Sequence, residues 1–89
     1  MKTKVENMTS NNGNKIANQF IIYTKTAKYF QSYDSIIVKK TNKVTYLDSY
    51  YWDYSPTTSK YRNIFLGETT KETEAKIKSG QYKLTNLNK

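Results

Sequence analysis

The chain has little aliphatic material from which to build a hydrophobic core. Its 89 residues include seven Ile, four Leu and three Val, against nine Tyr, three Phe and one Trp. A chain of this length forms one domain, and a domain this small is only marginally stable. Each buried aromatic side chain removes roughly 150–250 Å² of surface from water. We therefore expect large rings to replace much of the missing aliphatic core.

The aromatic residues are concentrated in one stretch. Five of the tyrosines and the only tryptophan lie within the twenty residues from Tyr46 to Phe65. In the run YYWDY, alternate rings point to opposite sides if the backbone is extended. Half of these rings are therefore expected in the core and half on the surface. The expected core residues are Phe20, Ile22, Phe30, Ile36, Val38, Trp52, Tyr61 and Phe65.

Hydrophobic alternation and turn residues predict a sheet in the first half of the chain. Residues 1–15 are polar and contain the turn signal NNGN, which predicts a flexible N-terminal tail. Four short strands with close turns are predicted over residues 18–24, 28–33, 35–40 and 44–48. Alternatively, the second and third of these form one longer strand that bends at Asp34.

Capping signals predict two helices in the second half. Ser55 is a good N-cap, Pro56 fits the first turn, and Gly67 suits a left-handed C-cap. Thr69 and Glu72 form a capping box that begins a second helix. A last short strand follows Gly80. The predicted fold is α+β: a small antiparallel sheet, made of a four-strand meander plus a C-terminal strand, with a helical hairpin on one face, in a single domain of residues 16–89.

The charge balance predicts affinity for polyanions. The formal net charge is +8, and fourteen of the fifteen cationic residues are lysines, with Arg62 the single arginine. Nucleic acid is the commonest polyanion in a cell. Lysine is a point charge, whereas arginine is suited to bidentate contacts with guanine or phosphate. The composition therefore favours weak, sequence-independent binding over reading of a DNA sequence.

Several kinds of chemistry are not expected. The chain has no cysteine and no histidine, which excludes disulfides, Cys/His zinc sites and imidazole acid–base catalysis. Asp48 and Asp53 are the nearest pair of carboxylates, but turn and cap roles suit their positions better. We therefore expect no enzymatic activity, no cofactor and no metal. No apolar run approaches the ~18 residues of a membrane span, and no signal peptide is visible, so we expect a cytoplasmic protein without membrane contact.

Aromatic and basic residues occur together along the predicted strands. In proteins that bind single-stranded nucleic acid, rings stack on bases while lysines follow the backbone. Tyrosine and tryptophan are also enriched in protein interfaces. Tyr29, Phe30 and Tyr33, with Lys25, Lys28, Lys39 and Lys40 near them, fit the first pattern. The residues predicted to bind a partner are Tyr29, Tyr33, Lys39, Tyr50, Tyr51, Lys60 and Arg62.

The segments FQSY (30–33), WDYSPTTSKYR (52–62) and FLG (65–67) resemble a family of small domains from phages and mobile elements of Firmicutes. The resemblance covers about Asn18 to Asn88, and similar domains also resemble the N-terminal part of staphylococcal anti-CRISPR proteins. It implies a counter-defence protein that binds and inhibits a Cas effector nuclease without catalysis. Because of its positive charge, such a protein would contact an acidic face of the nuclease, its guide RNA or its target DNA. A nucleic-acid-binding module and a self-associating interaction domain are the two alternatives.

Overall fold

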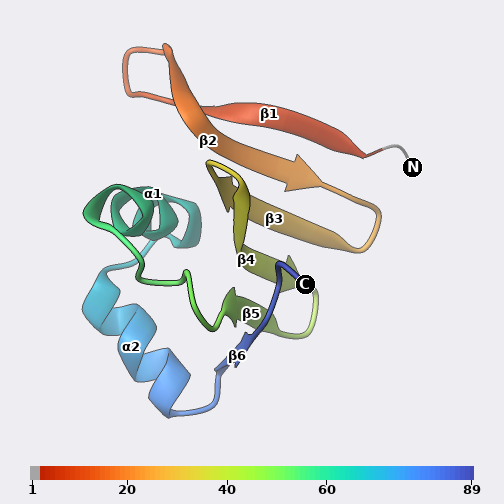
Figure 1. Cartoon of the computed structure of the whole chain (residues 1–89), viewed down its shortest axis with the longest axis vertical. Helices are drawn as coiled ribbons and strands as arrows, with labels where there is room; N and C mark the ends of the chain where they lie inside the picture. Colours follow the sequence, from red (N-terminus) through yellow and green to blue (C-terminus); the bar gives the residue numbers. More distant parts are fainter. Residues whose placement is uncertain (1–2) are drawn as a thin grey trace.

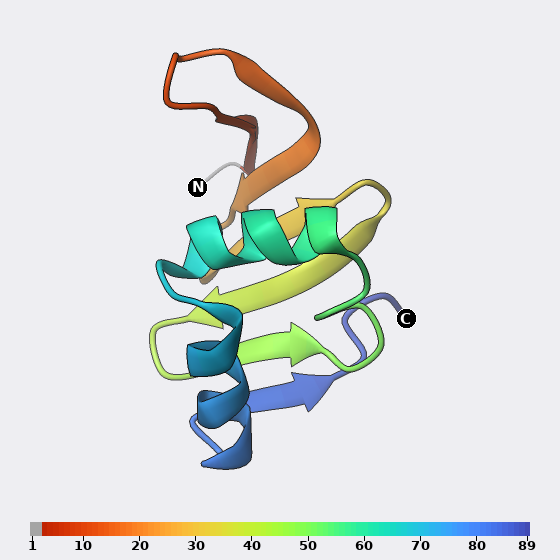
Figure 2. The same cartoon turned by 90° about the vertical axis from the view of Figure 1, so that its left-hand side faces the viewer.

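The computed structural model describes residues 3–89 and shows a six-stranded sheet with two helices on one of its faces (Figures 1 and 2). The strands and helices, in chain order, are β1 (Lys4–Thr9), β2 (Lys15–Tyr23), β3 (Ala27–Ser32), β4 (Ser35–Thr41), β5 (Thr45–Asp48), α1 (Pro56–Leu66), α2 (Thr70–Lys78) and β6 (Tyr82–Thr85). The fold is therefore α+β, as the sequence predicts.

The strands follow one another in the sheet in the order in which they occur in the chain. Neighbouring strands are antiparallel from β1 to β5, and short turns join them. β6 is parallel to β5. Two parallel neighbours need a long crossover between them, and α1 and α2 supply it.

The sheet has more strands than predicted, because β1 lies within the stretch expected to be a flexible tail. β1 pairs with β2, and the predicted turn signal closes their hairpin, with the Gly13 N–H donating to the Ser10 carbonyl at 2.9 Å. β1 is an edge strand and buries a single side chain, that of Met8. The other five residues of β1 are exposed or half-buried, so the strand lacks the hydrophobic alternation by which sequence analysis recognises a strand. Residues 1 and 2 of the predicted tail lie outside the described residues.

Both predicted helix starts are confirmed. The Ser55 hydroxyl accepts from the Thr58 N–H at 3.2 Å, and Thr69 and Glu72 form the expected capping box. Gly67 ends α1 at a φ of 70°, a conformation that glycine adopts without steric cost. The two helices cover the same face, but the axis of α1 lies along strands β4 and β5 while that of α2 runs across them (Figure 2). They therefore meet crosswise and do not form the predicted hairpin.

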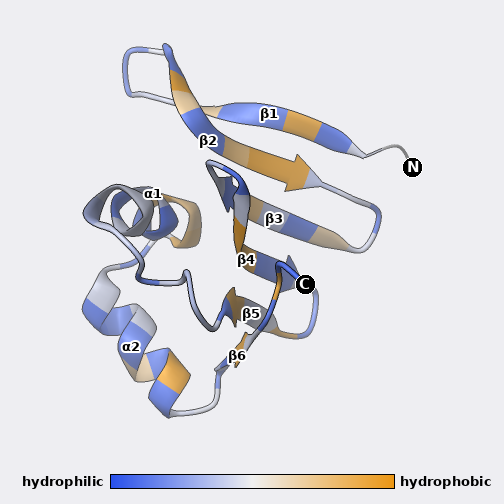
Figure 3. Cartoon of the chain, viewed as in Figure 1, coloured by the Kyte–Doolittle hydropathy of each residue, from blue (hydrophilic) through white to orange (hydrophobic). Residues whose placement is uncertain are grey.

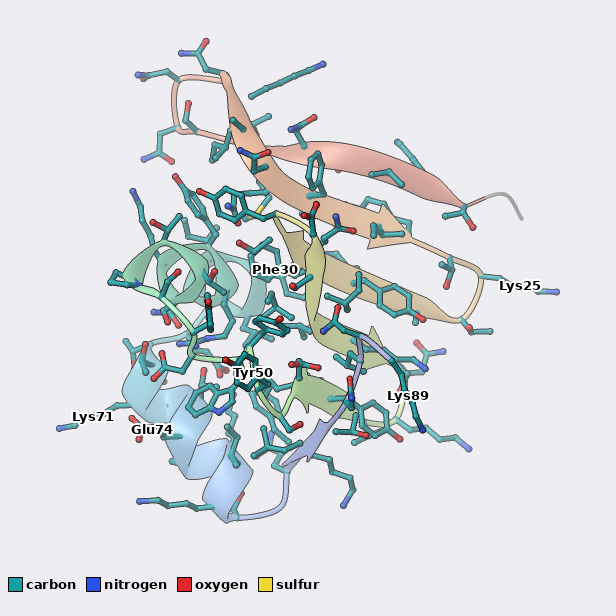
Figure 4. The ribbon with its side chains drawn as sticks, viewed as in Figure 1. Lys25, Phe30, Tyr50, Lys71, Glu74 and Lys89 are labelled. Carbon is teal, nitrogen blue, oxygen red and sulfur yellow. The ribbon has the colours of Figure 1, made fainter. Side chains whose placement is uncertain are left out.

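The core lies between the sheet and the helices. Its buried residues are Met8, Phe30, Ile37, Val38, Leu47 and Tyr82. Phe30 stacks on Phe65 of α1 with ring centroids 5.7 Å apart, and Figure 4 shows it between β3 and this helix. Trp52, Tyr61 and Phe65 pack against this cluster as half-buried residues. The aromatic contribution to the core is therefore confirmed.

Three residues of the predicted core lie elsewhere. Phe20, Ile22 and Ile36 are half-buried and point to the face that the helices leave uncovered. The second half of β2 is strongly hydrophobic (Figure 3), which led to this prediction. In β4 the register shifts so that Phe30 pairs with Val38 but Gln31 pairs with Ile36. The bulge leaves Ile37 as the extra residue and places it in the core instead of Ile36.

A carboxylate links α2 to β6. Glu68 accepts hydrogen bonds from the Lys76 ammonium at 2.6 Å, the Tyr82 hydroxyl at 2.8 Å and the Thr73 hydroxyl. Burial raises the pKa of Glu68, but these three donors outweigh it and leave the pKa below its ordinary value. The ionised form of Glu68 therefore stabilises the contact between the second helix and the last strand.

Candidate nucleic-acid interface

The seven residues predicted to bind a partner do not form one surface. Two lie on the uncovered face of the sheet, and three lie where the β3–β4 turn approaches the loop between β5 and α1. One lies on α1 beside a hollow that the β1–β2 hairpin also lines, and one is in the interior. The structure brings the first two together with residues that sequence analysis did not select.

A row of side chains crosses the uncovered face. Tyr29 on β3 lies opposite Lys39 on β4, which lies opposite Tyr46 on β5. Tyr29 points away from the helices because its neighbour Phe30 contacts α1. The Lys39 ammonium is 6.0 Å from the centroid of the Tyr29 ring and 5.9 Å from that of Tyr46, the outer range of a cation–π contact. The full row is Val5, Ile22, Tyr29, Lys39, Tyr46 and Lys83.

One end of the sheet gathers lysines. Lys28 on β3 lies directly opposite Lys40 on β4, and both are exposed. Like charges at opposed positions destabilise a sheet. Lys25 in the β2–β3 turn and Lys43 in the β4–β5 turn add two more charges beside this pair. We call Lys25, Lys28, Lys40 and Lys43 the lysine end.

Two open hollows flank these turns. One, of about 330 Å³, is lined by Lys25, Lys28 and Lys40 together with Tyr23 and neighbouring turn residues. The other, of about 420 Å³, is lined by Lys25, Lys43, Lys39 and Tyr46 among others. Neither hollow has an Asp or Glu in its lining. Lys28 and Lys40 point to the side of the sheet that the helices cover, where the Lys28 ammonium is 5.4 Å from the Phe65 ring centroid. Lys25 lines both hollows, so the lysine end meets the row on the uncovered face at Lys25 and Lys43.

Three predicted residues meet at the opposite end of the sheet. Tyr50 and Tyr51 contact each other and Tyr54, with ring centroids 4.7 to 5.8 Å apart. Tyr50 is 70% exposed, Tyr54 61% and Tyr33 52%, whereas Tyr51 is half-buried and packs on the core. A pocket of about 180 Å³ lies among Tyr33, Tyr51 and Tyr54, and no lysine lines it. We call Tyr33, Tyr50, Tyr51 and Tyr54 the tyrosine cluster.

Asp48 holds the backbone of this loop. Its Oδ2 accepts from the N–H groups of Tyr50 at 3.1 Å and Tyr51 at 2.8 Å, and its Oδ1 accepts from the Leu87 N–H at 2.8 Å. Burial raises the pKa of Asp48, but these donors outweigh it and leave the pKa below its ordinary value. The turn role expected for Asp48 is thus confirmed, and it extends to the C-terminal segment.

Tyr33 has a left-handed backbone with a φ of 55°, which costs a bulky residue roughly 1–2 kcal/mol. We expect Tyr33→Asn to raise the free energy of unfolding by roughly 1 kcal/mol, because Asn tolerates this conformation. Urea unfolding measures the change. Tyr33→Phe is the matched control, since it keeps both the ring and the strain and should leave stability unchanged. Lower stability in Tyr33→Asn would mean that packing of the ring outweighs the strain.

The last two predicted residues lie apart from both surfaces. Lys60 is exposed on α1, with its ammonium 5.2 Å from the ring centroid of Tyr61. Arg62 is fully buried, so the prediction that it lies on a contact surface is wrong. Its guanidinium donates to the Trp52 carbonyl, to Asn63 Oδ1 at 2.9 Å and to Thr70 Oγ1 at 2.8 Å. An arginine fork suits several fixed acceptors at once, and here it joins a loop to both helices.

Residues 3–89 contain no group of three or more His, Cys, Asp or Glu side chains that could hold a metal ion. In the same part of the chain, no helix has the length and apolar character needed to cross a membrane. The candidate surfaces are the lysine end with the adjoining row on the uncovered face, and the tyrosine cluster.

Comparison with known proteins places the chain in a family. A model described as a family of unknown function, DUF8033, matches residues 3–81, which include every element from β1 to α2. A search of curated proteins found no match, and a search of solved structures also found none. The chain therefore belongs to the family of unknown function DUF8033.

Proposed function

We propose that the chain is a cytoplasmic, non-catalytic protein that binds nucleic acid through the lysine end without reading its sequence. The observation that carries this proposal is the opposed pair Lys28 and Lys40, with Lys25 beside it and no carboxylate in the lining of the shared hollow. A phosphate group at this position would relieve the repulsion between the two ammonium groups. The net charge of +8 attracts the same partner at longer range.

The residue type also supports binding without sequence selectivity. The basic residues of this surface are all lysines, and the only arginine is buried in the interior. Bidentate arginine contacts with guanine are the commonest specific contacts in the major groove. Lysines here can neutralise phosphates, which adds affinity but carries no sequence information.

The salt dependence of binding tests the proposal. Binding of a fluorescein-labelled oligo(dT) is followed by anisotropy at increasing NaCl concentration. If the four residues of the lysine end each neutralise one phosphate, log Kobs should fall against log[salt] with a slope of about −2.8. A fourfold rise in salt would then weaken binding roughly fiftyfold. Absence of binding at low salt, or a slope near zero, would contradict the proposal.

Lys40→Thr is expected to strengthen folding and weaken binding at the same time. We expect it to raise the free energy of unfolding by about 0.5 kcal/mol, because it removes the charge opposite Lys28. It should also weaken oligo(dT) binding and make the salt slope less negative by about 0.7. Lys71→Gln is the matched control: Lys71 extends from α2 on the far side of the molecule from Lys25 (Figure 4). If both variants weaken binding equally, overall charge and not the lysine end determines affinity.

Inhibition of a Cas effector nuclease by direct contact is a second candidate, and the tyrosine cluster supports it. Tyr50 and Tyr54 are largely exposed, and Tyr33 is strained as well as exposed. Strained residues and exposed aromatic residues both concentrate at functional surfaces. A pull-down with a purified type II effector, after added nuclease has digested free nucleic acid, tests this candidate. Retention that depends on Tyr50 but not on Lys40 would support it, and loss of the complex after nuclease treatment would contradict it.

A further inference from the structure

We infer that the nucleic acid bound by this protein is single-stranded and that its bases stack on Tyr29 and Tyr46. The inference rests on the proposed function, because the row that contains both rings meets the lysine end at Lys25 and Lys43, which line the same hollow as Lys39 and Tyr46. It specifies that the uncovered face binds the bases of the ligand. Phosphates contact lysines, and base faces contact the two tyrosine rings.

The spacing of the two rings indicates a single strand. Tyr29 is on β3 and Tyr46 is on β5, with β4 between them. Neighbouring strands lie 4.7–4.9 Å apart, so the two residues are separated by about 10 Å. Adjacent stacked bases are only about 3.4 Å apart along a strand. Bases that lie on both rings must therefore be unstacked from each other, which a single strand allows and a duplex does not.

The two rings do not simply stabilise the sheet by contacting each other. Aromatic pairs that do so occupy directly opposed positions on neighbouring strands. Here Lys39 occupies the position between the rings and lies about 6 Å from each ring centroid. Neither helix covers this face, and each ring is half-buried. The arrangement places two half-buried rings on the uncovered face with a positive charge between them.

The surroundings of the row match an extended anionic chain. Lys39 and Lys83 are the charged members of the row, and Asp and Glu are absent from it. The hollow of about 420 Å³ beside Tyr46 leads from the row to Lys25 and Lys43. A strand whose bases lie on the rings can therefore place its phosphates near lysines on either side of Lys39.

Binding of three probes tests the inference: oligo(dT), a duplex of the same length, and heparin. Tyr29→Leu and Tyr46→Leu keep an apolar side chain but remove the flat ring. Each is expected to weaken oligo(dT) binding about tenfold or more, with the salt slope and heparin binding unchanged. Tyr29→Phe and Tyr46→Phe keep the ring and should bind oligo(dT) like the wild type. The wild type should prefer oligo(dT) to the duplex.

The outcomes distinguish this inference from the proposed function. If the duplex and heparin bind as tightly as oligo(dT), and the Leu variants lose nothing, stacking is wrong while binding by the lysine end stands. If the wild type binds none of the three probes, the proposed function itself fails. Photocrosslinking of the wild type to a bromodeoxyuridine-substituted oligonucleotide gives a result that does not depend on variants. Crosslinks should map to Tyr29 or Tyr46, and crosslinks confined to the tyrosine cluster would overturn the inference.

Discussion

Arg62→Ala is expected to lower the free energy of unfolding by about 3–5 kcal/mol, a large share of the roughly 5–15 kcal/mol available to a small domain. The guanidinium is fully buried and donates hydrogen bonds to the Trp52 carbonyl, Asn63 and Thr70. Its Cζ lies 5.1 Å from the Trp52 ring centroid. Removing it leaves a cavity and unpaired acceptors where the β5–α1 loop, α1 and α2 meet.

The charge state of this arginine is maintained by its surroundings. Burial lowers the pKa of Arg62, and the nearby Asp53 carboxylate, 3.4 Å from the guanidinium, opposes that shift. Arg62→Lys keeps the positive charge but loses the planar fork of donors, so we expect an intermediate loss of stability.

Urea unfolding at neutral pH measures these effects, with Lys60→Ala as the control. Lys60 is exposed on the same helix, and its replacement should change stability by no more than about 0.5 kcal/mol. An Arg62→Ala variant as stable as the Lys60→Ala variant would show that the buried guanidinium does not hold the helices to the loop. A wild-type midpoint in Arg62→Lys would mean that charge alone suffices.

Asp48→Asn is expected to lower the free energy of unfolding by about 1–3 kcal/mol at neutral pH. The carboxylate accepts three backbone N–H groups, from Tyr50, Tyr51 and Leu87. An Asn side chain has one acceptor oxygen, so its NH₂ group would face at least one backbone donor. The substitution therefore weakens the attachment of both the tyrosine loop and the C-terminal segment to β5.

The same variant predicts a change in pH dependence. The pKa of Asp48 is lowered in the folded protein, and an unfolded Asp titrates near about 3.9. The stabilisation is therefore fully present above about pH 4 and is lost as pH falls through the lower, folded-state pKa. The difference in stability between wild type and Asp48→Asn should narrow as the pH falls below about 4. Glu68 has the same sign of shift and keeps some acid sensitivity in the variant.

Urea midpoints measured across this pH range test the prediction, with Asp34→Asn as the control. Asp34 is exposed at the β3–β4 turn, and no hydrogen bond to its side chain is found within residues 3–89. We expect little change from its replacement at any pH. A difference between wild type and Asp48→Asn that stays constant or widens in acid would contradict the assigned role of Asp48.

Local signals in the sequence were sufficient for most of the secondary structure. Ser55 and Pro56 predicted the start of α1, and Thr69 with Glu72 predicted the start of α2, because a cap depends on residues three positions apart. Strands β2 to β5 carry enough β-branched and aromatic residues to be recognised. β1 was missed because an edge strand needs few buried side chains, and its hairpin turn has the composition of a disordered segment.

The sequence by itself determined the α+β class, the helix caps and the excess of lysine, since these depend on neighbouring residues or on composition. Only the tertiary structure decided which aromatic rings and which cationic side chains are exposed to solvent. The opposition of Tyr29, Lys39 and Tyr46 follows from strand register, and a shift of one residue would send each side chain to the other face. Sequence analysis placed Arg62, the single arginine, among the residues that bind a partner. Its burial depends on acceptors from the loop and α2 that come together only when the two helices pack on the sheet.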